Sequence, residues 1–213
     1  MLDELDQELE RRGHRFCRYA DDCNIYVHSQ RAGQRVKRSI TDFIERRLKL
    51  KVNEQKSAVA RPAERKFLGF SFTANGRKRR IAPKAILRFK RKVRELTSRT
   101  RGISLERMTK ELSIYLRGWK GYFGFCQTPR VLTNLEAWIR RRLRSYLCRQ
   151  WLNGPNRYKE LRRRGVPEFK AAVAAGSPTG LWRMSSHPAV NQALRNHTFD
   201  SLGLPRLYIP VGA

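Results

Sequence analysis

Acidic residues are scarce in this sequence. Of its 213 residues, 18 are Asp or Glu and 47 are Lys or Arg, which gives a formal net charge of +29. A chain with such an imbalance repels itself unless a polyanion neutralises it, which disfavours a basic protein without an anionic partner. Residues 1 to 60 carry a net charge of +3 and residues 61 to 213 carry +26. The polyanion is therefore expected to bind mainly along the later part of the chain.

Cysteine and histidine are also few and scattered. The four cysteines show no C-x-x-C spacing, and the four histidines are dispersed. This pattern predicts neither a zinc site nor a disulfide framework, and we interpret the cysteines as packed thiols in a reducing compartment. No apolar run approaches the length of a membrane span, and the acidic first ten residues do not form a signal peptide. We therefore expect a cytoplasmic protein that does not bind membranes.

What the sequence does contain is enough apolar material for a core. Hydrophobic residues make up 40% of the chain and aromatic residues 10%. This composition excludes a disordered basic tail, and the length allows one large or two small domains. No internal repeat or low-complexity tract is present.

A hairpin is predicted around the tetrapeptide Tyr19-Ala20-Asp21-Asp22. Residues 15 to 19 and 23 to 28 have strand patterning, so the two carboxylates fall at the tip between them. Neighbouring side chains at a strand end point in different directions, and at most one of the pair is expected to aim straight at a common site. Two acids here suit Mg²⁺, which prefers oxygen ligands. An ordinary polar turn remains the alternative, because Asp-Asp is common in turns.

The rest of the first part predicts further helices and strands. Leucines at helical spacing predict a short amphipathic helix that Gly13 ends, and Ser29 can cap a second helix running to about Leu48. Residues 58 to 60 resemble an edge strand, residues 67 to 72 alternate, and Asn75-Gly76 favours a two-residue hairpin that returns through residues 77 to 81. We expect residues 15 to 82 to form one small antiparallel sheet with a helix across it, which is half of a palm-like α+β domain.

From Pro83 onward the periodicity is helical. Three helices are expected: one from Pro83, one capped by Ser104, and one that begins with a capping box of Thr133 and Glu136. Their aromatic stripes, including Tyr115, Trp119, Tyr122, Trp138 and Tyr146, are interpreted as core in preference to base-stacking platforms. On the third helix, Arg140, Arg141, Arg142 and Arg144 are expected outside the bundle. Like charges at i and i+4 destabilise a helix, so the basic faces indicate an anionic ligand.

Residues 153 to 213 are less regular, with Gly and Pro at intervals, and short helices packed against the bundle are expected. Arg162-Arg163-Arg164 is a candidate phosphate contact, although charge runs are usually solvated.

Several motifs follow one another in a specific order. They are Phe16 to Asp22, Val52 to Ser57, Phe67 to Phe70, Tyr115 to Phe123, Leu135 to Arg144, Gly180 to Trp182, and Phe199 to Leu204. With these motifs the chain resembles, over essentially its whole length, the second half of a reverse transcriptase encoded by a bacterial group II intron. The resemblance implies an α+β fold: a partial polymerase palm at 1–82, a helical thumb or maturase domain at 83–152, and a C-terminal extension at 153–213.

The resemblance implies two-metal nucleotidyl transfer by an RNA-directed DNA polymerase that uses Mg²⁺. Asp21 would be the principal metal ligand of this segment and Asp22 the lesser one. Lys56 matches a lysine that would approach the incoming deoxynucleotide triphosphate, although an exposed loop lysine is an equal alternative. The turn from Phe67 to Phe70 would be the primer grip, where Gly69 lets the backbone approach the strand.

The expected partners are structured intron RNA, whose binding assists splicing, and an RNA/DNA template-primer. Contacts are expected mostly to phosphates and 2′-hydroxyls. The candidate nucleic-acid-binding residues are Tyr19, Lys56, Phe67, Gly69, Arg88, Arg91, Lys92, Arg117, Lys120, Arg140, Arg141 and Arg144.

One departure from the family pattern lies before the hairpin. Family members carry another metal-binding aspartate on an earlier strand, together with fingers that grip the template. None of the six acids before Asp22 resembles that aspartate. We therefore expect that this chain alone does not polymerise DNA and that it works as an enzyme only when an upstream piece completes it. A maturase-like RNA-binding module without chemistry, and an inert relic of a mobile element, are the alternatives.

Overall fold

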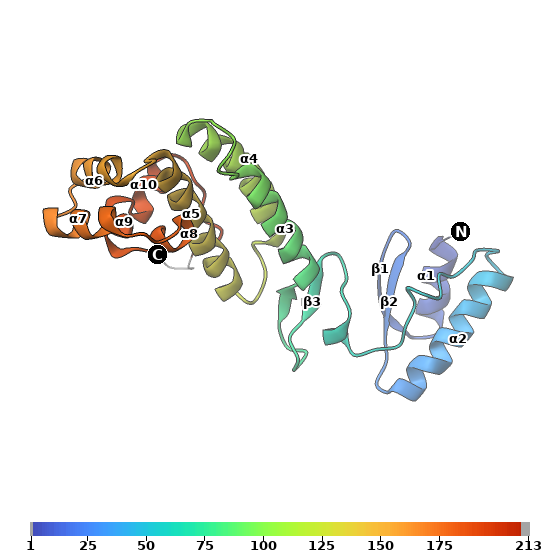
Figure 1. Cartoon of the computed structure of the whole chain (residues 1–213). Coiled ribbons are helices and arrows are strands. Elements are labelled where there is room, and N and C mark those ends of the chain that lie inside the picture. Colours follow the sequence, from blue (N-terminus) through green and yellow to red (C-terminus); the bar gives the residue numbers. More distant parts are fainter. Residues whose placement is uncertain (1, 210–213) are drawn as a thin grey trace. The chain divides into compact units, whose positions relative to one another are not determined.

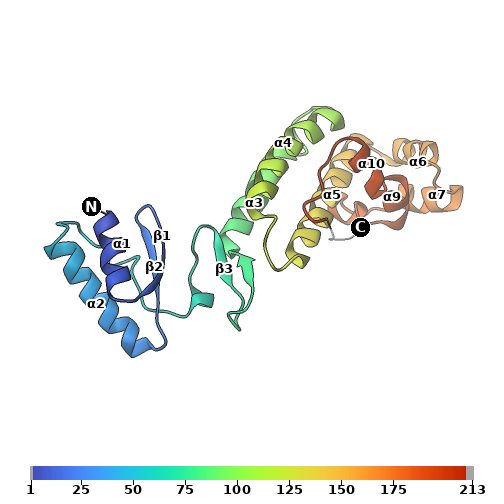
Figure 2. The same cartoon turned by 180° about the vertical axis from the view of Figure 1, so that it is seen from behind.

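The structure is a computed structural model that describes residues 2 to 209. Its contacts divide the chain into two compact units, with the division between Ala82 and Pro83. Figures 1 and 2 show the elements of both units from opposite sides. Each unit is described by itself.

The first unit begins with two helices and a hairpin. Helix α1 (Leu2–Arg11), strands β1 (Arg15–Tyr19) and β2 (Asp22–Tyr26), and helix α2 (Gln30–Arg46) follow in order. Leu5 and Leu9 of α1 pack with Ile40 of α2, and the inner side of the hairpin lies against this cluster. Gly13 has a φ of +68°, a conformation that suits glycine after a helix. Ser29 caps α2, since its hydroxyl accepts a hydrogen bond from the Ala32 amide at 3.2 Å.

The strands of the first unit form two separate two-stranded sheets, so the single sheet expected from the sequence is wrong. The second sheet pairs β3 (Phe70–Phe72) with β4 (Arg79–Ile81) and follows the short 3₁₀ helix η1 (Pro62–Glu64). The edge strand expected at residues 58 to 60 is absent. The segment instead lies against α2: the Lys37 ammonium donates to the Ser57 carbonyl at 3.1 Å. A Cβ on Gly33 would approach the Val59 side chain to 2.5 Å.

The hairpin at Asn75-Gly76 is present, but its loop is longer than the two residues expected. The Thr73 amide donates to the Lys78 carbonyl at 2.9 Å, which leaves residues 74 to 77 in the loop. The Asn75 side chain organises this loop, because its carbonyl oxygen accepts from the Thr73 hydroxyl at 2.6 Å and from the Arg77 amide at 3.2 Å.

The described part of the second unit is helical throughout. Helices α3 (Pro83–Leu96), α4 (Leu105–Phe123) and α5 (Arg130–Gln150) are long, and five short helices follow. In Figures 1 and 2 the short helices gather beside α5. Their bounds are α6 (Gly154–Arg163), α7 (Glu168–Gly176), α8 (Leu181–Met184), α9 (Pro188–Ala193) and α10 (Asn196–Ser201). The expected fold class, α+β with a helical bundle, is confirmed.

Aromatic rings join α3 to α4. The Phe89 ring is fully buried, and its centroid lies 4.3 Å from that of Trp119 and 5.8 Å from that of Tyr115. The interpretation of these rings as core is therefore correct. Tyr122 and Trp138 are exceptions although their spacing assigned them to the core: Tyr122 is 48% exposed, and Trp138 is half-buried and lines a pocket.

Helix α5 begins at Arg130, so the expected capping box is wrong. The Thr133 hydroxyl donates to the Arg130 carbonyl at 3.0 Å instead of capping the helix. The Glu136 carboxylate accepts from the amides of Leu207 and Tyr208, so the end of the described chain uses the group that would have closed the box.

The contact between Gly33 and Val59 yields a prediction about stability. Gly33→Ala should destabilise the docking of residues 57 to 60 on α2 by about 1 kcal/mol or more, because the added methyl displaces Val59. In a Val59→Ala background the same change should stabilise α2, since alanine favours a helix interior over glycine by about 1 kcal/mol. Hydrogen exchange of the α2 amides measures both effects. Equal effects of Gly33→Ala in the two backgrounds would contradict the close packing.

Candidate functional site

The two carboxylates lie at the tip of the β1–β2 hairpin, as the sequence predicts. Tyr19 pairs with Asp22 across the strands, so Ala20 and Asp21 form the turn. Ala20 has a φ of +52°, and its carbonyl accepts a hydrogen bond from Arg18 at 2.9 Å. Tyr19, Asp21 and Asp22 are all exposed. The tip therefore presents one aromatic ring and two acids to solvent.

An ion pair that the sequence did not reveal braces this hairpin against α1. The Arg18 guanidinium binds the Asp6 carboxylate with two hydrogen bonds, one of them 2.7 Å long from Nε. The hydrogen bond from Arg18 lowers the pKa of Asp6 against the opposing effect of desolvation, and it raises the pKa of Arg18. Because Arg18 also holds the turn carbonyl, α1 fixes where the carboxylates stand. Asp6 itself is occupied by this pair.

The hairpin acids fit one hard cation by their chemistry. Among the described residues, neither the Asp21 nor the Asp22 carboxylate has a hydrogen-bond or ion-pair partner, so their oxygens are available. Residues 2 to 209 contain no group of three or more His, Cys, Asp or Glu side chains that could hold a metal ion. A pair of metal ions needs more carboxylates than these two. The hairpin thus has the donors for one part of such a centre.

Lys56 and the segment from Phe67 to Phe70 lie in tight turns. Lys56 is exposed, and its amide donates to the Asn53 side chain at 3.1 Å. Phe67 and Phe70 exchange two backbone hydrogen bonds of 2.9 Å each. Leu68 and Gly69 between them have φ values of +49° and +77°, which is the geometry of a two-residue hairpin turn that requires glycine.

The candidate basic residues of α3 and α4 are mostly exposed. Arg88, Arg91 and Arg117 are exposed and have no acceptor within the described chain. Lys120 is half-buried, and the Lys92 ammonium lies 3.2 Å from the Glu95 carboxylate in a solvent-exposed pair. Such a pair contributes little stability and can exchange for a phosphate.

The arginines of α5 are different, because Arg140, a candidate nucleic-acid-binding residue, is buried within the protein. Its side chain is 5% exposed, and its guanidinium lies 3.1 Å from Glu136 and 2.8 Å from Asp200. It is a buried ion-pair centre that joins α5 to α10. The physical reason is that the stripe facing the short helices on α5 includes this position, which helical periodicity alone assigned to the outside.

Arg141 and Arg144 also contact the protein. Arg141 stacks over the Trp182 ring at 4.0 Å and donates to the Trp182 carbonyl at 2.9 Å. Arg144 donates to the Leu194 carbonyl at 2.9 Å and to the Asn196 side chain at 3.0 Å. Both side chains are half-buried, so the expectation that they stand free outside the bundle is wrong. They hold the short helices to α5.

The charge run at residues 162 to 164 is likewise engaged. Arg162 donates to the Val166 carbonyl at 2.9 Å, and both Arg163 and Arg164 pair with Glu160. The alternative reading of this run as a phosphate site gains no support from these contacts.

Within residues 2 to 209, no helix combines the length and the apolar character that crossing a membrane would require.

The buried ion pair predicts a specific loss of stability. Arg140→Ala should lower the free energy of unfolding of the second unit by about 3–5 kcal/mol, because the largely buried Glu136 would lose its ion-pair partner and Asp200 would keep only Arg206. All four tryptophans lie in this unit, so their fluorescence during urea unfolding measures the loss. Arg149→Ala, at an exposed position of the same helix, is the control. An effect of Arg140→Ala no larger than that of the control would contradict the structural role.

The same ion pair predicts a pH dependence. Burial raises the pKa of Asp200, but hydrogen bonds from Arg140 and Arg206 outweigh it, so the pKa lies below its ordinary value of 3.8. A carboxylate with a lowered pKa stabilises the fold above the unfolded-state pKa and loses this contribution as the pH falls through the folded-state pKa. Asp200→Asn should therefore destabilise the unit at pH 7, and the difference from wild type should shrink below about pH 4. A difference that stays constant down to pH 2 would contradict this account.

Two family models match the chain. Residues 1–72 match the reverse transcriptase (RNA-dependent DNA polymerase) family, and residues 86–165 match the maturase-specific domain of group II introns. None of the curated proteins matches it. The first family is a divalent-metal-dependent polymerase, and both families bind nucleic acid, including intron RNA. The hairpin with two carboxylates and the basic helices fall within these two matches, in the same order. The chain belongs to the group II intron reverse transcriptase/maturase family.

Proposed function

We propose that the second unit binds structured intron RNA through the exposed basic faces of α3 and α4, and that this binding assists splicing. The observation that carries the proposal is the separation of charges within the unit. Five of the seven carboxylates between residues 83 and 209 are paired with Lys or Arg, whereas Arg88, Arg91 and Arg117 have no acceptor in the described chain. These three guanidinium groups remain for phosphates.

RNA suits these faces better than a specific DNA sequence does. Arginines on a helix surface bind phosphates and 2′-hydroxyls across the shallow minor groove of an RNA helix, where shape is recognised. Such contacts fix position and orientation without reading base edges. The ion pair of Arg140 with Asp200 and the hydrogen bonds of Arg141 and Arg144 hold the short helices to α5.

We propose that Asp21 and Asp22 hold Mg²⁺ as one part of an RNA-directed DNA polymerase centre, with Asp21 as the principal ligand. Bound Mg²⁺ would activate the primer hydroxyl and neutralise the triphosphate. The chain's own contribution is to present both carboxylates on a short turn that Arg18 and Asp6 hold rigid. Lys56 would neutralise leaving-group charge on a deoxynucleotide triphosphate, and the turn at Gly69 would approach the primer of an RNA/DNA template-primer.

We further propose that the chain by itself does not polymerise DNA. A pair of metal ions needs more carboxylates than Asp21 and Asp22, and the described residues form no group of three acids that could hold a metal ion. RNA binding does not share this requirement, because its residues lie in the second unit.

The RNA-binding proposal is tested by removing Arg88, Arg91 and Arg117 together. The variant Arg88→Gln, Arg91→Gln, Arg117→Gln should bind intron RNA more weakly, and the slope of log affinity against log salt should fall by about 3, because each phosphate contact contributes about 1. Titration at several salt concentrations measures both effects.

The matched control removes three exposed arginines of α2: Arg35→Gln, Arg38→Gln and Arg46→Gln. It should change the slope much less. Equal losses in the two variants would show that overall charge, and not the faces of α3 and α4, controls binding.

The catalytic proposal is tested with Asp21→Ala, Asp22→Ala. RNA affinity and any assistance to splicing should stay within about twofold of wild type, because neither carboxylate takes part in the phosphate contacts of α3 and α4. In primer extension with Mg²⁺, the wild-type chain alone should give no template-dependent product. A product that disappears in the variant would show a complete polymerase and contradict the proposal for the isolated chain.

A further inference from the structure

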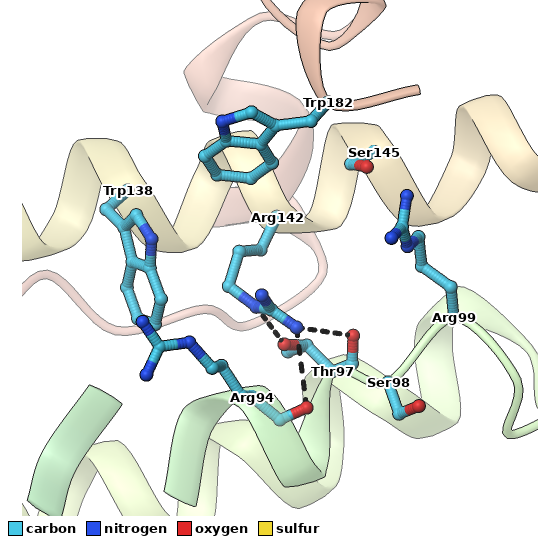
Figure 3. A pocket seen from close by; sticks show the side chains of 8 residues that line it. All are labelled: Arg94, Thr97, Ser98, Arg99, Trp138, Arg142, Ser145 and Trp182. Carbon is cyan, nitrogen blue, oxygen red and sulfur yellow. Dashed lines mark hydrogen bonds between the residues drawn. The ribbon is translucent and has the colours of Figure 1, made fainter. Parts of the chain in front are cut away.

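A pocket of about 410 Å³ lies in the second unit between the end of α3, the middle of α5, and α8. Figure 3 shows Arg94 and Trp138 at one side of it, Arg99 and Ser145 at the other, and Arg142 and Trp182 between them. The remaining lining residues are Thr97 and Ser98. The volume lies within the usual range for small-ligand pockets, which begins at about 300 Å³.

The charge of this pocket is entirely positive. Three guanidinium groups line it, and no carboxylate does. The pKa of Arg142 is lowered by burial and by the nearby charges of Arg94 and Arg99. Concentrating three cations without an acid is unfavourable in the free protein, and a bound anion would relieve it.

The three arginines have different tasks. Arg142 is held by the protein: its Nε donates to the Thr97 hydroxyl at 2.6 Å, and its Nη2 donates to the Thr97 carbonyl at 3.1 Å. The guanidinium groups of Arg94 and Arg99 have no acceptor among the described residues. Arg142 therefore has a structural role in the pocket, whereas Arg94 and Arg99 have donors that are available to a phosphate.

The walls of the pocket offer aromatic surface and one unused hydroxyl. The guanidinium carbons of Arg94 and Arg142 lie 5.6 and 5.4 Å from the centroid of the Trp138 ring. Arg141 stacks on the Trp182 ring and holds it in place. Ser145 is 2% exposed, and its hydroxyl has no hydrogen-bond partner within the described chain. A buried hydroxyl of this kind costs stability unless a ligand satisfies it.

We propose that this pocket receives one unpaired nucleotide of the bound RNA, with its phosphate between Arg94 and Arg99 and its base against the indole rings. Inorganic phosphate would use the arginines but leave the two indoles and the Ser145 hydroxyl unused. An extruded base uses all three, because unstacked bases of RNA are recognised by aromatic stacking and by hydrogen bonds to their edges. The proposal rests on the proposed RNA binding and adds a preference for unpaired nucleotides.

The test compares two RNA duplexes of equal length, one fully paired and one with a single bulged nucleotide. The full chain should bind the bulged duplex about tenfold more tightly, because stacking on an aromatic side chain contributes about 1–3 kcal/mol per base. Replacing the bulged base with 2-aminopurine should give fluorescence that falls on binding, as the base stacks on an indole. The proposal is overturned if the wild-type chain binds both duplexes equally.

Substitutions in the pocket test whether the preference for the bulged duplex depends on it. Arg94→Gln, Arg99→Gln should abolish it, and both side chains are exposed, so the fold should survive. The control Arg130→Gln, Arg149→Gln removes two exposed charges of α5 outside the pocket and should weaken both duplexes while keeping the ratio. If the pocket variant behaves like the control, the proposal is wrong.

Two further outcomes distinguish the pocket proposal from the proposed RNA binding on which it rests, and distinguish an RNA nucleotide from a free nucleotide as the ligand. Equal binding of both duplexes overturns the pocket and leaves the proposed RNA binding intact, whereas failure to bind either duplex overturns both. A free nucleoside 5′-monophosphate should remove the preference for the bulge without releasing the paired duplex, and inorganic phosphate at the same concentration should not. Binding of the free nucleotide without any preference for the bulge would overturn the proposal for RNA.

Discussion

The second unit depends on one buried ion-pair centre at Arg140. Its guanidinium joins Glu136 of the same helix to Asp200 of α10, and Glu136 in turn accepts the amides of Leu207 and Tyr208. Planar guanidinium donors suit two carboxylates at once, which a lysine could not match. The short helices after α5 bury apolar side chains such as Leu161, Met184 and Phe199, and the charge-assisted hydrogen bonds of Arg140 add a directional contact to this packing.

Arginine serves two opposite purposes in this unit. Arg141 and Arg144 use their donors on backbone carbonyls of the short helices and stack on Trp182 and Phe199. Arg88, Arg91 and Arg117 have no such acceptors and stay exposed. The large positive charge is therefore divided between groups that stabilise the fold and groups that await an anion. This division, more than the net charge, supports nucleic-acid binding by the helical unit.

In the first unit, an arginine that binds both a carboxylate and a backbone carbonyl likewise stabilises a turn. Arg18 holds the Ala20 carbonyl and the Asp6 carboxylate together, so α1 supports a strained two-residue turn without using Asp21 or Asp22. The two acids that the family would use for metal binding are thus left available. Gly69 shows a comparable dependence on local geometry, because the turn between Phe67 and Phe70 needs a positive φ at two successive residues.

Local patterns in the sequence determined the hairpin at Tyr19 to Asp22, the helix caps at Ser29 and Ser104, and the inward-facing stripe of α4 that includes Trp119. Each depends on residues close in sequence or on one helical period. Only the tertiary structure decided which polar side chains are covered by other segments, because hydrophobic periodicity does not report long-range contacts. The polar face of a helix looks the same whether it meets solvent or another segment, so Arg140 was assigned to the outside although Asp200, sixty residues later, buries it. The pocket at Arg94 and Arg99 joins three separate segments. Val59 lies against Gly33 of α2, although its local pattern predicted an edge strand.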